Sequence, residues 1–269
     1  LTLVSGGKDS AVALEVIKNN QQALLLNPTP AALEISKIAG ITHPLIVERT
    51  IDPQLLQLNQ QGYLNGHTPF SAYLAFLSLL VASLFGFRHI VVANERSSDE
   101  ANVDYLGHKI NHQYSKTLDF ERSFRGYVAR YISPSLNYFS LLRPLWEIQI
   151  SQIFSRYPQY FLIFKSCNVN QKQNSWCGRC AKCLSTFILL YPFMPEATVS
   201  IFNNNLIKDS RLANLITHLT GKNIPKPFEC VGTIREIKAA LHFPQDLKIL
   251  LKDWGHDEFI PKDLQVKLK

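Results

Sequence analysis

Ser5-Gly6-Gly7-Lys8-Asp9-Ser10 follows an apolar stub at residues 1–4 and precedes the helix-like run AVALEVIKNN. This order predicts a strand, a tight glycine turn and the start of a helix. Two glycines let backbone N–H groups approach an anion closely, and a helix N-terminus favours negative charge. Ser5 and Ser10 add hydroxyl donors, Lys8 adds a positive charge, and Asp9 is a candidate magnesium ligand. The stretch therefore predicts a phosphate-binding site.

The spacing of these residues distinguishes the stretch from other phosphate-binding motifs. It matches neither the Walker loop nor the dinucleotide-binding fingerprint. An ordinary strand-to-helix turn is the alternative, since Ser, Gly and Asp are common at helix starts. The hexapeptide resembles the SGGxDS fingerprint of the PP-loop ATP pyrophosphatases. That resemblance implies an enzyme that splits ATP into AMP and pyrophosphate, usually by adenylating a substrate oxygen.

Composition indicates a folded protein with an anionic partner. The chain has 269 residues, of which 46% are hydrophobic and 18% charged, so it can bury a large core. Its net charge of +7 suits a nucleotide, a sugar nucleotide or RNA.

The first residues of the chain and one long apolar run indicate where in the cell the protein is expected to lie. Leu1 already lies in the expected first strand, and the only Met is Met194, so we expect an upstream region to be missing. Residues 70–86 carry no charge, but the preceding Thr68 and Pro69 are typical of a helix start. We therefore expect a buried helix between two strands, no membrane segment and a cytoplasmic protein.

Apolar runs alternate with helical patterns over the first two-thirds of the chain. The runs predicted as strands are Leu1–Val4, Ala23–Leu26, Pro44–Val47, His89–Ala93 and Tyr160–Phe164. The segments between the first four are predicted helices, so we expect an α/β fold with a doubly wound parallel sheet covered on both faces. Ligands bind such sheets beyond the carboxyl ends of the strands.

The pattern changes near residue 195. Short helical segments follow, interrupted by Gly221, Pro225 and Pro227, and no strand is apparent. We therefore predict a catalytic domain at residues 1–195 that includes a cysteine cluster, and a small helical C-terminal region at residues 196–269.

Four of the five cysteines fall in the stretch SCNVNQKQNSWCGRCAKC, as Cys167, Cys177, Cys180 and Cys183. This spacing lets several thiolates converge on one metal ion, and four sulfurs in a tetrahedral array suit zinc. Disulfides, free thiols and an iron–sulfur cluster are the alternatives. The predicted zinc site is structural, because four thiolates leave no position open for water.

Three further polar stretches are expected near the phosphate loop. In Asn94-Glu95-Arg96-Ser97-Ser98, the guanidinium of Arg96 is a candidate to stabilise phosphate charge, and Asn94, Glu95 and Ser97 are candidates to bind the nucleotide or its magnesium ion. In residues 111–116, His112 is a candidate general base. In residues 226–233, Cys230 stands beside a carboxylate at the expected start of a helix and is a candidate for proton exchange.

Taken in order, these motifs carry a closer resemblance. SGGKDS, NGHTPFS, NERSS, NHQYSK, WCGRCAKC and KPFECVGT look like the MurL family, the UDP-N-acetylmuramoyl-L-alanyl-L-glutamate epimerases of bacterial cell-wall synthesis. The resemblance implies that ATP drives inversion of the terminal L-glutamate of a UDP-muramoyl dipeptide to D-glutamate. It also implies a further region before the phosphate loop.

The resemblance implies a role for several candidate residues. Ser5, Gly6, Gly7 and Ser10 bind pyrophosphate, Asp9 holds Mg²⁺, and Lys8 and Arg96 stabilise charge. From their own chemistry and expected placement, and not from the resemblance, we hypothesise that Cys230 or His112 exchanges the proton.

Other functions remain open on the sequence alone. The cysteine pattern is similar to that of 7-cyano-7-deazaguanine synthase, and the charge and cysteines also suit a tRNA-thiolating PP-loop enzyme. A zinc-knuckle nucleic-acid-binding module is a further alternative. We expect no nucleic-acid partner, because the basic residues are dispersed and the aromatics form no stacking motif.

Overall fold

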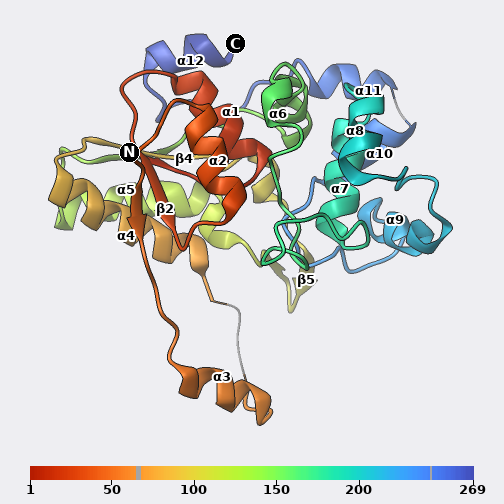
Figure 1. Ribbon diagram of the computed structural model, residues 1–269, viewed down its shortest axis with the longest axis horizontal. Coiled ribbons are helices and arrows are strands. Elements are labelled where there is room, and N and C mark those ends of the chain that lie inside the picture. The colour runs from red at the N-terminus through yellow and green to blue at the C-terminus, as the bar shows by residue number, and fades with distance from the viewer. Residues whose placement is uncertain (65–67, 243) are drawn as a thin grey trace.

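A five-stranded parallel sheet lies at the centre of the protein (Figure 1). The computed structural model describes residues 1–64, 68–242 and 244–269. The strands are β1 (Thr2–Leu3), β2 (Ala23–Leu26), β3 (Leu45–Val47), β4 (His89–Val92), β5 (Val103–Tyr105), β6 (His108–Ile110) and β7 (Asn137–Ser140). β5 and β6 form a separate antiparallel hairpin. The α/β class and the parallel sheet are confirmed.

The order of the strands creates the binding position of the sheet. The chain runs from β1 outward to β2 and β3, and then returns to β4 on the other side of β1, with β7 beyond it. The order therefore reverses between β1 and β4. In parallel sheets a crevice for ligands opens at such a reversal, beyond the carboxyl ends of the strands.

Helices cover both faces of the sheet (Figure 1). They are α1 (Lys8–Ile17), α2 (Pro30–Ile38), α3 (Pro53–Gln60), α4 (Phe70–Phe85), α5 (Leu118–Tyr131), α6 (Glu147–Phe154), α7 (Ala181–Leu190), α8 (Pro195–Phe202), α9 (Ala213–Leu219), α10 (Ile234–His242), α11 (Pro244–Leu250) and α12 (Lys262–Leu268). Alternate strand residues face opposite ways, so Ile90 and Val92 pack with α4 and α5 whereas Val91 packs with the cluster that includes α1 and α6.

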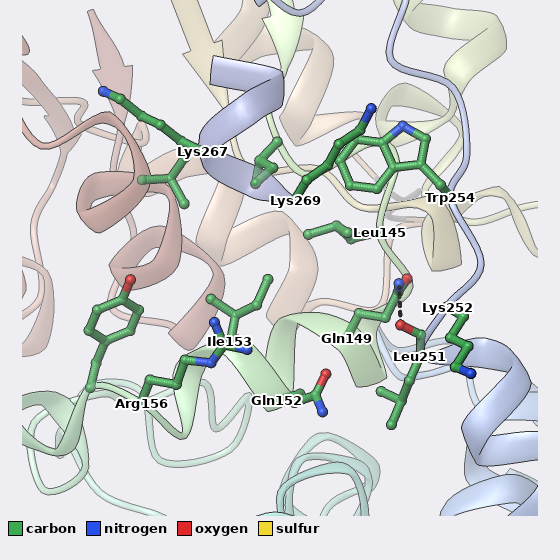
Figure 2. A pocket seen from close by; sticks show the side chains of 13 residues that line it. Leu145, Gln149, Gln152, Ile153, Arg156, Leu251, Lys252, Trp254, Lys267 and Lys269 are labelled. Atoms are coloured by element: carbon green, nitrogen blue, oxygen red, sulfur yellow. Dashed lines mark hydrogen bonds between the residues drawn. The ribbon is translucent and has the colours of Figure 1, made fainter. Parts of the chain in front are cut away.

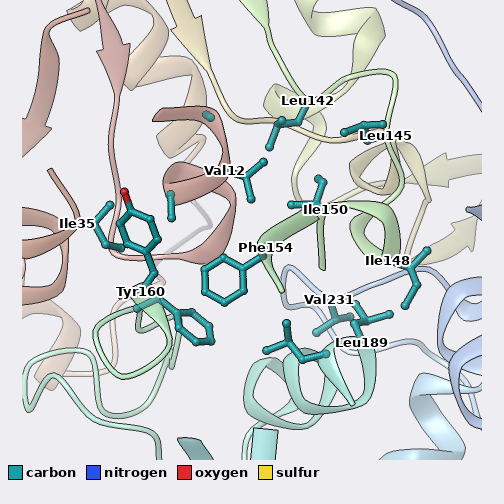
Figure 3. Close-up of a cluster of buried hydrophobic side chains, with 14 of the residues drawn as sticks. Val12, Ile35, Leu142, Leu145, Ile148, Ile150, Phe154, Tyr160, Leu189 and Val231 are labelled. Carbon is teal, nitrogen blue, oxygen red and sulfur yellow. The ribbon is translucent and has the colours of Figure 1, made fainter. Parts of the chain in front are cut away.

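One continuous core joins the sheet to the C-terminal helices. Val12 of α1 and Phe154 of α6 belong to the same buried cluster as Leu189 of α7 (Figure 3). The cluster extends to α12, where Lys267 Nζ donates to the carbonyl of Ile17 at 3.2 Å. Between 195 and 269, the described residues form helices and turns. These helices pack on the α/β core through α6, α7 and α1.

The predicted strand at Tyr160–Phe164 is wrong. Residues Pro158–Tyr160 form a short 3-10 turn, and the amides of Ile163 and Phe164 both donate to the carbonyl of Tyr160. A strand would place Leu162 on the same face as the buried Tyr160 and Phe164, but Leu162 is 72% exposed, which fits a helical turn. The fifth strand of the sheet is instead β7, which the sequence reading missed.

The predicted start of the apolar helix needs correction. The helix α4 begins at Phe70 with Pro69 as its N-cap, and Thr68 contributes only its backbone carbonyl, which accepts from Phe70 N. It is also not buried all round, since Phe76, Leu80 and Leu84 are exposed. Among the described residues, none of the helices has the length and apolar character needed to cross a membrane. Residues 65–67 of the NGHTPFS motif lie outside the described residues.

Candidate active site

The phosphate loop, residues 5–10, connects β1 to α1 at the reversal point of the sheet. A Cβ on Gly6 would lie 2.9 Å from Ala31 Cβ and 3.3 Å from the carbonyl oxygen of Lys165, so position 6 needs glycine. A Cβ on Gly7 would lie 2.9 Å from Ser166 Oγ, a hydroxyl that can rotate away. Ser5 N donates to Ser10 Oγ at 2.9 Å and closes the turn. Gly7 caps α1 without a side-chain hydrogen bond. The first N–H groups of the helix can therefore bind an anion.

Glu147 is a buried carboxylate that pairs with two lysines. At the start of α6 it accepts from Lys8 Nζ at 3.2 Å and from Lys182 Nζ at 3.4 Å. Lys8 also contacts Asp9 at 2.5 Å. Burial alone would raise the pKa of Glu147, but Lys182 and Lys8 hold that pKa at about 2. Glu147 is thus a fixed negative charge that links the phosphate loop to α7.

The two lysines are fixed positive charges. Burial alone would lower the pKa of Lys8, but the carboxylates of Asp9 and Glu147 outweigh burial and raise it. The same competition raises the pKa of Lys182, with Glu147 and then Asp9 as the main carboxylates. Two ammonium groups therefore remain charged beside residues 5–10, where they can stabilise the charge of a bound anion.

Cys230 and Glu95 are two groups near this cluster that can exchange protons. Lys116 Nζ donates to Cys230 Sγ at 3.2 Å. Burial would lower the pKa of Lys116, but Cys230 and Glu95 raise it. Burial raises the pKa of Glu95 to about 7, the Asp9 carboxylate adds to the rise, and Lys116 opposes it. A thiol held by a lysine and a carboxyl that titrates near neutrality suit acid–base chemistry.

Arg143 holds the loops of Glu95 and Lys116 in place. Its buried guanidinium pairs with the Glu121 carboxylate at 3.2 Å. The same guanidinium donates to the carbonyl of Glu95 at 2.9 Å and to that of Lys116 at 2.6 Å. The guanidinium of Arg143 therefore holds the backbone of both Glu95 and Lys116 in place.

The structure places Arg96, Asn94 and Ser97 differently from Glu95. Arg96 pairs with Asp253 at 3.0 Å, and its guanidinium stacks 4.3 Å from the ring centroid of Trp146. Asn94 Nδ2 donates to Ser140 Oγ, and Ser97 Oγ accepts from Glu147 N at 2.8 Å, which fixes the start of α6. These three side chains therefore bond to protein groups, and Glu95 is the member of the stretch whose charge interacts with the lysine cluster.

His112 lies on the Cys230 side of the site. Its Nδ1 lies 2.7 Å from Asn102 Oδ1, and its ring meets Phe228 edge-on. Burial, Lys116 and Lys226 lower the pKa of His112, so the neutral imidazole is favoured. Cys230 itself lies in the loop before α10, which begins at Ile234. The predicted position of Cys230 at a helix start is therefore wrong.

The structure brings together residues that the sequence reading missed. These are Lys116, Glu147 and Lys182. Lys182 was visible only as part of the motif CGRCAKC, and Glu147 follows the dipeptide Leu-Trp after β7. The sequence around these charged residues does not indicate that they are buried. Their place in the site becomes apparent only from the residues with which they pair in the structure.

The four clustered cysteines form a compact sulfur site. Their Sγ atoms all lie within 4.8 Å of one another, with Cys177 to Cys183 at 3.7 Å and Cys180 to Cys183 at 3.5 Å. Sulfurs that bind one zinc ion tetrahedrally lie about 3.8 Å apart, given Zn–S bonds of about 2.3 Å. None of the five cysteines forms a disulfide. This geometry fits a single ion better than sulfurs on separate irons of a cluster.

A cavity of about 490 Å³ lies elsewhere, where α1, α6 and α12 meet (Figure 2). Arg156, Lys252, Lys267 and Lys269 line it together with Trp254, and the phosphate-loop residues do not. In Figure 2, Gln149 Nε2 donates to the carbonyl of Leu251 at 3.4 Å across one wall. The cavity is therefore separate from the candidate active site.

The pKa of Glu95 predicts how its replacement affects stability. A carboxyl whose folded pKa is about 7 destabilises the fold as pH rises from about 4.5 to about 7, because ionisation is easier in the unfolded chain. We expect Glu95→Gln to raise the free energy of unfolding by ~1–3 kcal/mol at pH 8, and by little at pH 4.5. Urea unfolding at both pH values measures this, with the exposed Glu196→Gln as control. An equal gain at both pH values would contradict it.

Comparison with known proteins places this chain in a family. The sequence model of the MurL N-terminal domain matches residues 1–141, and that of the MurL C-terminal domain matches residues 163–263. A relative from Micromonospora sp., named UDP-N-acetyl-alpha-D-muramoyl-L-alanyl-L-glutamate epimerase, is 36% identical over 249 residues, which are 90% of this chain and 56% of the relative.

Two further relatives carry the same name. Those from Salinispora tropica and Xanthomonas oryzae pv. oryzae are each 36% identical over 90% of this chain, and the match covers 54% and 55% of their lengths. The chain thus spans about half the length of the curated relatives it matches. Both domain matches and these identities confirm the resemblance drawn from the motifs, and this chain belongs to the MurL family.

Proposed function

We propose that this chain carries the catalytic site of an ATP-dependent epimerase of the PP-loop type. Its substrate would be UDP-N-acetylmuramoyl-L-alanyl-L-glutamate, and the product would carry D-glutamate. One observation supports this most: Lys8 and Lys182 pair with Glu147 beside the phosphate loop, and the charge of Cys230, which accepts from Lys116 Nζ at 3.2 Å, helps to raise the pKa of Lys182. Adenylation and proton exchange can then occur on one bound glutamate.

The first step makes the weakly acidic α-C–H of the terminal glutamate more acidic. A carboxylate oxygen of the terminal glutamate attacks the α-phosphorus of ATP, and the bond to pyrophosphate breaks. Residues 5–10 bind the departing pyrophosphate, while Lys8 and Lys182 stabilise its charge. The partly exposed Asp9 carboxylate would hold Mg²⁺, which would neutralise further phosphate charge when bound. The resulting anhydride withdraws electrons, so the neighbouring α-proton becomes more acidic.

The second step inverts the carbon. The Cys230 sulfur removes the α-proton as a thiolate that Lys116 stabilises, and a proton returns to the opposite face. Glu95 is a candidate donor for that face, because burial raises its pKa to about 7 and keeps part of it protonated near neutrality. Water then cleaves the anhydride, which releases AMP and restores the carboxylate.

Chiral analysis tests the function directly. The purified protein is incubated with ATP, Mg²⁺ and the UDP-muramoyl dipeptide in D₂O. The dipeptide is then hydrolysed, and the enantiomers of the released glutamate are resolved. We expect D-glutamate with deuterium at the α-carbon, and AMP and pyrophosphate formed only when the dipeptide is present. Lys8→Met is the matched control that should form neither AMP nor D-glutamate. Only L-glutamate, with AMP formed on a deazapurine or on tRNA, would support the alternative PP-loop enzymes.

We also propose that the four-cysteine cluster binds a structural zinc ion. We expect about one zinc per chain by atomic emission, as four thiolates complete a tetrahedral shell. Cys180→Ser should lower the zinc content and destabilise the protein by ~2–5 kcal/mol. Cys230→Ser, which removes a cysteine outside the cluster, should keep the zinc. Iron with inorganic sulfide in place of zinc would contradict this proposal.

A further inference from the structure

The loop that carries Cys230 is tied to the cysteine cluster by one carboxylate. Glu229 Oε2 accepts from Asn168 Nδ2 at 2.8 Å and from Lys182 N at 3.2 Å. Asn168 follows Cys167 directly, and Lys182 lies between Cys180 and Cys183. A single oxygen therefore connects both halves of the cysteine cluster to the residue that precedes Cys230.

A second tie lies on the other side of Cys230. Gly232 N donates to Ser185 Oγ of α7 at 3.0 Å, and both groups are buried. A Cβ on Gly232 would lie 2.9 Å from Leu189 Cδ1, so the loop is pressed against α7. Val231 packs beside Leu189 in the core (Figure 3). The Cys230 loop therefore follows α7, whose first turn belongs to the cysteine cluster.

The site needs this connection because its proton-transfer pair spans two distant segments. Lys116, the partner of Cys230, lies on the loop that Arg143 fixes to the sheet. Cys230 has no such bond to the sheet in the described part of the chain, and its own side chain bonds to Lys116. On the side of Lys116, Lys226 pairs with Glu100, Ile234 N donates to Glu100 Oε1 at 3.2 Å, and Asn102 Nδ2 donates to the carbonyl of Pro227 at 3.1 Å. These contacts hold the two ends of the loop, and the bonds of Glu229 and Gly232 hold its middle, where Cys230 lies, on α7.

We propose that Glu229 is a positioning residue that transmits the geometry of the cysteine cluster to Cys230. The inference rests on the proposed function for the role of Cys230, but not for the tie itself. A neutral glutamine also offers one oxygen that can accept both hydrogen bonds, whereas alanine offers none. Position 229 therefore needs an acceptor rather than a charge.

Alkylation of Cys230 tests the tie without any substrate. Zinc-loaded protein is treated with iodoacetamide, and the Cys230 peptide is quantified over time by mass spectrometry. We expect Glu229→Ala to react about tenfold faster than wild type, since losing two hydrogen bonds frees the loop. Glu229→Gln should react within about twofold of wild type. Glu196→Ala changes an exposed residue on α8, is the matched control, and should react at the wild-type rate.

Turnover separates this inference from the proposed function. We expect the rate of deuterium incorporation at the α-carbon to fall about tenfold in Glu229→Ala, while its rate of ATP cleavage stays near that of the wild type. Glu229→Gln should incorporate deuterium at close to the wild-type rate. Three results would each overturn the inference. Cys230 of Glu229→Ala could react at the wild-type rate, Glu229→Ala and Glu229→Gln could react equally fast, or Glu229→Ala could lose its zinc. Failure of epimerisation in every variant, with the alkylation pattern intact, would overturn only the proposed function.

Discussion

Cys230→Ala is expected to slow glutamate inversion by about 10²- to 10⁴-fold while leaving ATP cleavage largely intact. The variant removes the sulfur that Lys116 holds at 3.2 Å, but it leaves the phosphate loop and the Glu147 ion pairs unchanged. Adenylation would therefore proceed without proton removal. Two assays on the same sample measure this: pyrophosphate release, and deuterium incorporation at the α-carbon.

His112→Gln is the informative companion to this variant. Both residues were candidates for proton exchange on the sequence, and both lie near Lys116 in the structure. Because Nδ1 of His112 lies 2.7 Å from Asn102 Oδ1, a glutamine there is expected to reduce turnover less than loss of Cys230 does. Normal deuterium incorporation in Cys230→Ala, together with its loss in His112→Gln, would transfer the base role to His112.

Glu147→Gln is expected to destabilise the protein by ~3–5 kcal/mol, the range for breaking a buried ion pair from one side. The change leaves the buried ammonium of Lys182 without its carboxylate and leaves Lys8 with Asp9 alone. Urea unfolding at pH 7 measures the loss. Exposed Glu196→Gln is the matched control and should change stability by less than ~0.5 kcal/mol.

A double-mutant cycle shows whether the loss comes from the ion pair. Lys182→Met removes the ammonium and keeps most of the side-chain volume, so Glu147→Gln should cost clearly less in that background. The pH dependence gives a second check. The pKa of Glu147 is about 2 in the folded protein and 4.5 in the unfolded chain. The ionised carboxylate therefore stabilises the fold fully above about pH 5, and this stabilisation is lost as pH falls toward 2. An equal cost in both backgrounds would contradict the pairing.

Local patterns in the sequence predicted much of the fold. The first four strands and the helices between them follow from short apolar runs separated by turns and helical periods, and the structure confirms them. β7 was missed because Asn137–Ser140 has two polar ends and only two apolar residues. Tyr160–Phe164 was misread because a buried turn and a buried strand have similar compositions, and the choice depends on the surrounding packing.

The candidate active site and the cysteine cluster also have features that follow from the sequence and features that only the tertiary structure decides. The sequence by itself determined the strand, turn and helix around residues 5–10 and the convergence of four cysteine sulfurs, because each depends on residues that are close along the chain. Only the tertiary structure decided that Glu147 meets Lys8, 139 residues away, and that Lys116 meets Cys230, 114 residues away. Such pairs form where the strand order and the packing of α6 and α7 bring distant segments together, and a charged residue gives no local sign of its partner.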